Sequence, residues 1–338
     1  KAEPHEFERR LMEKVGLAGK HVLVAGGAGF VGSALLRILL SSGALVWSFD
    51  DYSTGSEEHL PDHPNLIRVE GDACEEESVR ALFSKAGFHQ VYHCIGDTFV
   101  PEAYDFPHRF FARNVGTTLN LLKAAEDSRS LERMLYVSST EVYGEISQEH
   151  ADEGCELRPV NTYAVSKLAA DRLCYTYFLE HGVPVITARI FNCYGPRATH
   201  EYVIPEIIRQ LHESSTLRLG NVDAERDFTY VDDTAKGLIA LSNSALPHGD
   251  VANIGSSKAT SVRDLAMRIA GIMGLEDVHI EQDAGRLRRH DIVRFCADSS
   301  KLRNATGWSP DIGLDEGLRR TIDWYQENGR RWTWMSRA

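Results

Sequence analysis

A glycine-rich turn between an apolar run and a helical pattern constrains this sequence more than any other feature. The apolar residues 20–25 predict a buried strand, and the sequence GGAGFVG follows at residues 26–32. Residues 33–40 carry leucines at helical spacing, and residues 44–49 form a second apolar run that closes on two acids, 50–51. A strand, a glycine turn, a helix and a second strand in this order predict one βαβ unit of a parallel sheet.

The position of the glycines predicts that this unit binds a dinucleotide. Glycine keeps the turn tight and lets the backbone approach a pyrophosphate, which the free N–H groups at the helix N-terminus attract. Asp50 follows the last glycine at about the 20-residue spacing of a carboxylate that binds ribose hydroxyls. Asp51 adds a second acid, and no Arg or Lys follows before Arg68, which disfavours a 2′-phosphate. We therefore expect NAD rather than NADP as the cofactor.

Strand and helix patterns alternate through the first half of the chain. Apolar runs predict further strands at residues 66–69, 90–95, 134–139 and 184–190. Helical spacing predicts helices at residues 78–86, 108–127 and 161–181. Alternation of this kind predicts an α/β fold, a doubly wound parallel Rossmann sheet with helices on both faces.

The pattern becomes less regular after residue 192, where helices are still readable at 203–213, 233–242 and 261–273. We expect an NAD-binding domain at residues 20–192. Residues 193–338 are expected to form mainly a smaller substrate-binding lobe, with elements that return to the main domain. An amphipathic pattern at 4–18 predicts an accessory helix within residues 1–19.

Composition limits the class of protein. With 43% hydrophobic and 25% charged residues, the chain has the balance of an ordinary globular protein, and its net charge of −12 disfavours a nucleic-acid partner. No apolar run reaches the length of about 18 to 20 residues that crosses a membrane, and no signal peptide is recognisable. The six cysteines lack paired metal-ligand spacing. We expect a cytoplasmic protein with reduced thiols and without a metal site.

A tyrosine and a lysine four residues apart carry the clearest catalytic signal. Tyr163 and Lys167 lie in the helical pattern 161–181, where positions i and i+4 share a face. A nearby ammonium lowers the pKa of a phenol, which predicts that Tyr163 acts as a base near neutral pH. The strand pattern 134–139 ends in Ser138 and Ser139. A hydroxyl there is expected to hydrogen-bond the substrate oxygen that Tyr163 deprotonates.

Several motifs in order resemble the extended short-chain dehydrogenase/reductase family, in particular its nucleotide-sugar epimerases, dehydratases and decarboxylases. The resemblance covers about residues 20–325, with motifs at 25–32, 71–72, 138–144, 163–167, 189–197, 226–231 and 307–308. It implies a nucleotide-diphosphate sugar as the substrate. It also implies a homodimer formed through a four-helix bundle of helices 108–127 and 161–181, with Leu121, Leu122, Leu168 and Leu173 as candidate apolar positions.

The same resemblance assigns residues to each part of the site. Against the cofactor we expect Gly26, Gly29, Phe30, Val31, Gly32, Asp50, Asp51, Asp72, Ala73, Cys94, Tyr163 and Lys167. The expected catalytic residues are Ser139, Thr140, Glu141, Tyr163 and Lys167. Substrate contacts are expected from Asn192, Val203 and Arg226, with Arg286 and Arg288 as further guanidinium groups for the diphosphate. The alternative for Arg286 and Arg288 is a solvated basic loop.

Glu141 separates the reactions that the resemblance allows. Members of this group begin alike, with Tyr163 taking a proton from a sugar hydroxyl, usually at C4. In a 4,6-dehydratase, a glutamate at this position removes the C5 proton of the 4-keto sugar, and Thr140 matches the hydroxyl residue of the GDP-mannose type. We expect an NDP-hexose 4,6-dehydratase. The alternatives are a UDP-glucuronate decarboxylase, an NDP-sugar 4-epimerase and, more remotely, a non-catalytic NAD-binding regulator.

Overall fold

The first strand, helix and second strand form where the sequence predicts them. In the computed structural model, which describes residues 16–336, they are β1 (His21–Ala25), α2 (Phe30–Ser41) and β2 (Leu45–Asp50). β1 and β2 are parallel neighbours, with Val22 opposite Val46 and Ala25 opposite Phe49. The βαβ prediction is therefore confirmed.

Seven parallel strands form the main sheet, in the order β10-β6-β5-β4-β1-β2-β3. The further strands are β3 (Leu66–Glu70), β4 (Gln90–His93), β5 (Arg133–Ser139), β6 (Val185–Ile190) and β10 (Val251–Ile254). The order reverses between β1 and β4, the kind of switch point at which open α/β sheets bind ligands. The predicted doubly wound sheet is confirmed.

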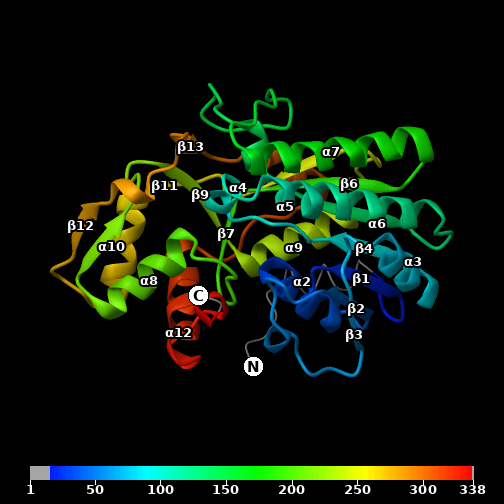
Figure 1. Cartoon of the computed structure of the whole chain (residues 1–338), viewed down its shortest axis with the longest axis horizontal. Helices are drawn as coiled ribbons and strands as arrows, with labels where there is room; N and C mark the ends of the chain where they lie inside the picture. Colours follow the sequence, from blue (N-terminus) through cyan, green and yellow to red (C-terminus); the bar gives the residue numbers. More distant parts are fainter. Residues whose placement is uncertain (1–15, 337–338) are drawn as a thin grey trace.

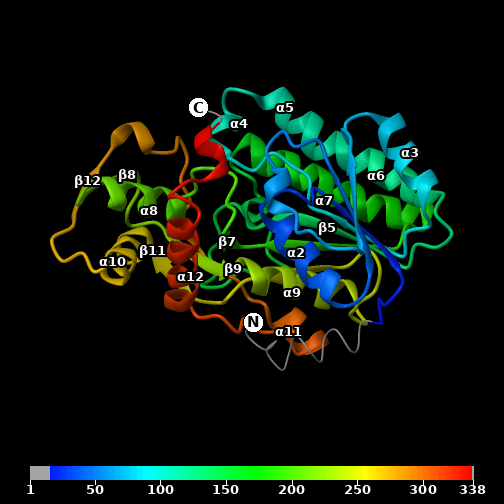
Figure 2. The same cartoon turned by 90° about the horizontal axis from the view of Figure 1, so that it is seen from below.

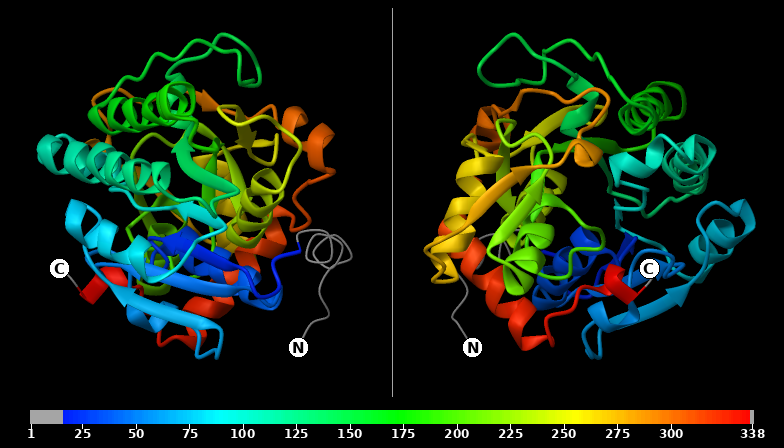
Figure 3. Two further views of the ribbon diagram at one scale, coloured as in Figure 1. Left: turned by 90° about the vertical axis from the view of Figure 1, so that its right-hand side faces the viewer. Right: turned by 60° about the vertical axis from the view of Figure 1, so that its left-hand side comes forward.

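Helices cover both faces of the sheet because its strands are apolar on both sides. α3 (Glu76–Lys85), α6 (Thr117–Glu126) and α7 (Thr162–His181) pack on one face, and α2, α9 (Val231–Ser242) and α11 (Ser300–Thr306) cover the other. The left view of Figure 3 looks along these layers, with α6 and α7 to the left of the strands and α9 and α11 to the right. No helix among residues 16–336 is long and apolar enough to cross a membrane.

A smaller lobe stands beside the sheet and has its own apolar core (Figure 1). It contains α8 (Val203–Glu213), β8 (Thr216–Leu219), β9 (Glu225–Tyr230), β11 (Ala259–Ser261), α10 (Val262–Ile272), β12 (His279–Gln282) and α12 (Leu314–Glu327). The short strands β7 (Asn192–Tyr194) and β13 (Arg294–Phe295) both pair with β9 and lead between the lobe and the main sheet. Figure 2 shows α12 on the side of the lobe that faces α2.

The helix predicted at 108–127 is the main element that differs. It is divided into α5 (Pro107–Phe111), a π-helical turn at Ala112–Gly116, and α6. Asn114 lies in this widened turn, and its Nδ2 donates to Ser166 Oγ at 2.8 Å and to the Asp97 carbonyl at 3.1 Å. Single π turns of this kind occur mostly beside functional sites.

The predicted accessory helix lies mainly outside the described residues. Its last positions, 16–18, are described and are not helical, because they lead through a turn into β1. Leu17 is buried in this turn and packs on the core of the main domain.

Candidate active site

A cavity of about 880 Å³ runs along the carboxyl ends of the parallel strands. Residues that follow β1, β2, β4, β5 and β6 line it on one side, and the smaller lobe closes it on the other. All the residues predicted from the sequence for the site, except Lys167, line this one cavity: Gly26, Gly29, Phe30, Val31, Gly32, Asp50, Asp51, Asp72, Ala73, Cys94, Ser139, Thr140, Glu141, Tyr163, Asn192, Val203, Arg226, Arg286 and Arg288. Residues separated widely in sequence therefore share one enclosure.

The glycine turn between β1 and α2 cannot accept larger residues. Gly26 has φ of +84°, and a Cβ on it would lie 3.0 Å from the backbone of Cys94 and Ile95. A Cβ on Gly32 would lie 2.0 Å from the Gly26 carbonyl oxygen. Within the described chain no side chain caps α2, whose N-cap residue is Gly29. The first N–H groups of this helix therefore remain available to an anion.

Asp50 links the end of β2 to this turn. Its Oδ2 accepts a hydrogen bond from the Ala28 N–H, and its Oδ1 accepts one from the Tyr52 N–H, each at 2.9 Å. Burial raises the pKa of the Asp50 carboxyl, while these two N–H donors oppose the shift. The carboxylate thus holds two chain segments together and still lines the cavity.

Arg113 is a cavity residue that the sequence did not indicate. It lies in the π-helical turn and reaches across to the loop after β2, where Nη2 is 3.2 Å from Asp51 Oδ2 and Nη1 donates to Ser53 Oγ at 2.5 Å. The sequence has no Arg or Lys between Asp51 and Arg68, but the fold brings the more distant Arg113 to Asp51. Arg113 is paired with Asp51, so its charge is largely compensated there.

Ser139 and Tyr163 face each other as the sequence predicts, but the electrostatics differ. Burial raises the pKa of the Tyr163 hydroxyl well above its ordinary value, and the hydrogen bond with Ser139 opposes this shift. The ring packs among Val100, Ala103 and Phe110, which explains the desolvation. The expected lowering of this pKa by Lys167 is therefore wrong for the structure.

Lys167 lies beneath the cavity rather than on its wall. Its Nζ donates to the Val137 carbonyl at 2.6 Å and stands 4.8 Å from the ring centre of Tyr136. Burial lowers the pKa of the Lys167 ammonium to about 8. The cations and anions that act on the Tyr163 hydroxyl are Arg288 and Glu141, and Lys167 is not among them.

A buried polar network anchors the turn that carries the catalytic candidates. Tyr143, at the end of the 140–143 turn, donates to Asn253 Oδ1 at 2.7 Å and accepts from Arg189 Nη1 at 3.1 Å. Arg189 in turn donates to Asp171 of α7 at 3.0 Å. All four side chains are buried, so the turn is fixed to β6, β10 and α7 together.

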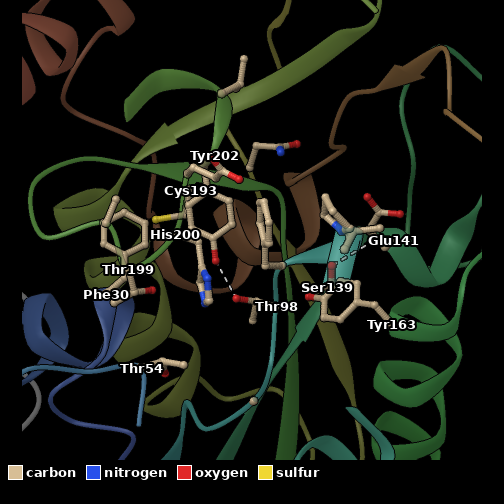
Figure 4. Close-up of a pocket in the computed structure, with 18 of the residues that line it drawn as sticks. Phe30, Thr54, Thr98, Ser139, Glu141, Tyr163, Cys193, Thr199, His200 and Tyr202 are labelled. Carbon is tan, nitrogen blue, oxygen red and sulfur yellow. Dashed lines mark hydrogen bonds between the residues drawn. The ribbon is translucent and has the colours of Figure 1, made fainter. Parts of the chain in front are cut away.

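Glu141 projects from this turn into the cavity beside Tyr163 (Figure 4). Its Oε2 accepts from Asn161 Nδ2 at 3.0 Å, and its Oε1 lies 3.3 Å from Arg288 Nη1. The neighbouring hydroxyl oxygen of Thr140 is buried and has no hydrogen-bond partner among residues 16–336. The site therefore presents a carboxylate and an unsatisfied hydroxyl next to the Ser139–Tyr163 pair.

The predicted substrate arginines each have a carboxylate partner. Arg226 Nη2 donates to Asp291 at 2.8 Å, and Arg286 Nη2 is 2.9 Å from Glu206. A guanidinium has five N–H donors, so these contacts leave donors free for a further anion. Asn192 adds a buried Oδ1 that has no partner in the described part of the chain.

Aromatic residues opposite the catalytic turn also escaped prediction. Tyr202 and Thr98 share a hydrogen bond of 2.6 Å (Figure 4). The rings of Phe99 and His200 stack with their centres 5.4 Å apart. Burial raises the pKa of Tyr202 to about 12, although its hydrogen bond with Thr98 opposes the shift. No residue pattern marks these positions in the sequence, because each partner comes from a distant loop.

The sequence matches the family described as GDP-mannose 4,6-dehydratase over residues 23–321. It is 31% identical to a dTDP-D-glucose 4,6-dehydratase of Homo sapiens, over 96% of this chain and 96% of the human protein. It is 34% identical to the low-salt glycan biosynthesis protein Agl12 of Haloferax volcanii, over 90% of this chain and 98% of that protein. One similar solved structure is the dTDP-glucose 4,6-dehydratase DesIV of Streptomyces venezuelae with NAD and TYD bound. Its TM-score is 0.85 and its sequence identity is 28%, over 93% of this chain and 99% of that chain.

Proposed function

Because this chain belongs to the GDP-mannose 4,6-dehydratase family of nucleotide-sugar enzymes, we propose that it is an NAD-dependent NDP-hexose 4,6-dehydratase. Membership of the family confirms the resemblance on which the sequence analysis relied. The position of the Glu141 carboxylate supports the dehydratase reaction. This carboxylate lines the same cavity as Tyr163 and stands beside the Thr140 hydroxyl, which has no hydrogen-bond partner among the described residues. A simple 4-epimerase needs no base at this place, since its keto sugar has only to rotate in the site and present its other face.

NAD fits the residues at the glycine turn. The uncapped N-terminus of α2 offers N–H groups to a pyrophosphate, and Asp50 and Asp51 line the cavity where the adenosine ribose would lie. The domain division proposed is residues 20–192 for this cofactor and mainly residues 193–338 for the nucleotide sugar. NAD, when bound, would accept the hydride from C4 and would later return it to C6.

The residues of the chain have distinct roles in the proposed reaction. Tyr163 takes the proton of the C4 hydroxyl, and Ser139 orients that oxygen by a hydrogen bond. The positive charge of NAD⁺, when bound, would favour the phenolate, which burial alone disfavours. Glu141 then takes the C5 proton, which the C4 ketone has made acidic, and water leaves from C6. Thr140 donates a hydrogen bond at the departing hydroxyl. Arg226, Arg286, Arg288 and Asn192 hold the diphosphate, where planar guanidinium groups give bidentate contacts.

The product mass tests this proposal directly. Incubation with a panel of UDP-, GDP-, dTDP- and CDP-hexoses should give a product lighter than its substrate by one water. A product lighter by one carbon dioxide would instead identify a decarboxylase, and an unchanged mass with altered retention would identify an epimerase. Absence of any product would favour a non-catalytic NAD-binding protein.

Replacing Asp50 by alanine should weaken NAD binding by about 1 to 3 kcal/mol, the range of a charge-assisted hydrogen bond. The variant also loses the acceptor of the Ala28 and Tyr52 N–H groups, so the turn itself should loosen. Calorimetric titration with NAD measures the loss. Asp62→Ala, which removes a carboxylate outside the cavity, is the matched control, and NAD affinity equal in both variants would exclude Asp50 from the site.

Turnover should fall as the pH rises through about 8, because burial lowers the pKa of Lys167 to about 8 and the ammonium is lost above it. The proposed role of this ammonium is to hold the nicotinamide ribose, so its charge is required. A series of kcat measurements on both sides of pH 8 locates the alkaline limb, the part of the pH profile in which kcat falls. Lys167→Arg stays charged throughout. An alkaline limb that remains in that variant would show that Lys167 is not its source.

A homodimer is predicted, with α7 at its interface. The candidate leucines need correction: Leu121 and Leu122 are fully buried in the core of the main domain, so they are not available to a partner. The exposed apolar side chains on α7 are Val165, Tyr175 and Leu179. Light scattering at micromolar concentration should give twice the chain mass.

Charge placed on this exposed face should dissociate the dimer. The double substitution Tyr175→Glu and Leu179→Glu should shift the scattering mass toward one chain, because it buries two carboxylates of each chain at the interface. Met267→Glu, on the exposed face of α10, is the control and should stay dimeric. A wild-type mass of one chain would refute the dimer.

A further inference from the structure

The two oxygens of the Glu141 carboxylate have different surroundings. Oε2 accepts from Asn161 Nδ2 at 3.0 Å, and Oε1 lies 3.3 Å from Arg288 Nη1. Glu141 and Arg288 line the cavity, whereas Asn161 does not. Oε2 is therefore turned toward the protein, and Oε1 is the oxygen that faces the cavity.

Asn161 also begins the helix that carries Tyr163. It is the N-cap residue of α7, and its Oδ1 accepts a hydrogen bond from the Ala164 N–H at 2.8 Å. This cap settles the orientation of the amide, because an oxygen bonded to an N–H leaves the NH₂ group to face Glu141. With only 8% of Asn161 exposed, the side chain is held by both contacts. One amide thus connects the helix of Tyr163 to the carboxylate of Glu141.

The two partners of Glu141 differ in how easily they can leave. Asn161 is buried and bonded at both ends, so it has no alternative position. Arg288 makes one longer contact, and 36% of its side chain is exposed. A substrate diphosphate carries more charge than one carboxylate and accepts a guanidinium in a bidentate manner. Arg288 is therefore the partner that a substrate can draw away, and Asn161 is the one that stays.

We propose that Asn161 is a positioning residue that fixes Oε2 of Glu141 and leaves Oε1 to take the C5 proton. The inference rests on the proposed dehydratase function. In the step concerned, the C5–H bond breaks and its proton passes to Oε1. The electron pair forms the C5–C6 double bond, the C6–O bond breaks, and the hydroxyl leaves with that proton as water. Without Asn161 the carboxylate can rotate, and its oxygen no longer lies in line with C5–H.

The test uses substitutions that keep the cap and remove the amide N–H donor. Serine and aspartate cap helices about as well as asparagine, so Asn161→Ser and Asn161→Asp should fold and melt like the wild type. Neither can donate an N–H to Glu141. In single-turnover reactions with an NDP-hexose, both should form the 4-keto sugar at the wild-type rate but release water at least about tenfold more slowly, because the general base is misplaced. Asn161→Asp should be slower, since two carboxylates then face each other.

Two further measurements separate positioning from a structural effect. Exchange of the C5 hydrogen with deuterium oxide should slow in proportion to water release. Asn328→Ser, which removes an exposed amide at the end of α12, should leave every step unchanged. Wild-type rates of water release in both Asn161 variants, or equal slowing of oxidation and elimination, would overturn the inference alone. Failure of the wild-type enzyme to release water from any NDP-hexose would overturn the proposed function, and the inference with it.

Discussion

Tyr163→Phe should lower turnover by about 10³ to 10⁴, at the upper end of what general-base catalysis contributes. The proposed reaction begins with removal of the C4 hydroxyl proton, and phenylalanine has no group to accept it. Only one hydroxyl is lost, and the ring keeps its packing among Val100, Ala103 and Phe110. Binding of NAD and of the nucleotide sugar should therefore remain within a few-fold of wild type.

Single-turnover absorbance and equilibrium binding check the two halves of this expectation. The variant should show no reduced nicotinamide on addition of substrate, although both ligands bind. Tyr177→Phe removes a hydroxyl from the same helix away from the cavity and is the matched control. Appreciable hydride transfer in Tyr163→Phe would mean that another group, such as the phenol of Tyr202 in the same cavity, takes the proton.

The main sheet could be predicted because its signals are local. The tight turn at Gly26 and Gly32, the short apolar strands and the amphipathic helices each depend on residues close together in the chain. The carboxyl ends of parallel strands meet at one edge, so Asp50, Ser139 and Asn192 could be expected in one site before any coordinates were known.

The parts that sequence reasoning missed depend on distant partners. The π-helical turn contains Asn114, whose partner Ser166 is 52 residues away. Tyr202 meets Thr98 across 104 residues, and Glu141 meets Arg288 across 147. No local pattern reports such pairs. The Asn114 pair is fixed by the packing of two helices of the main domain, and the other two are fixed by how the lobe closes on the sheet.

The error over the pKa of Tyr163 has a related cause. Helical spacing correctly placed Lys167 one turn from Tyr163, and it could not show that the ammonium is bonded to the Val137 carbonyl. It also could not show how deeply the phenol is buried. Desolvation is a property of the packed site, and here it is the largest cause of the raised pKa of Tyr163.

Glu141→Gln should separate oxidation of the sugar from loss of water. The amide keeps the shape of the side chain and can still accept from Asn161, but it cannot take the C5 proton. Oxidation at C4 depends on Tyr163 and Ser139, so it should continue. The 4-keto sugar should then accumulate on the enzyme while release of product slows by about 10² to 10⁴, the usual contribution of a general base.

Rapid-quench mass analysis and nicotinamide absorbance on the same sample distinguish this result from general damage to the site. Glu145→Gln, an exposed acid just beyond the turn, should behave as wild type. A decarboxylase would release carbon dioxide in the wild-type reaction and is identified by that loss. In a 4-epimerase the keto sugar needs no base at C5, so Glu141→Gln would turn over within a few-fold of wild type. Such turnover, with product and substrate equal in mass, would contradict the dehydratase and support an epimerase. In that case only Ser139 and Tyr163 of the expected catalytic residues beside the sugar would take part in the reaction.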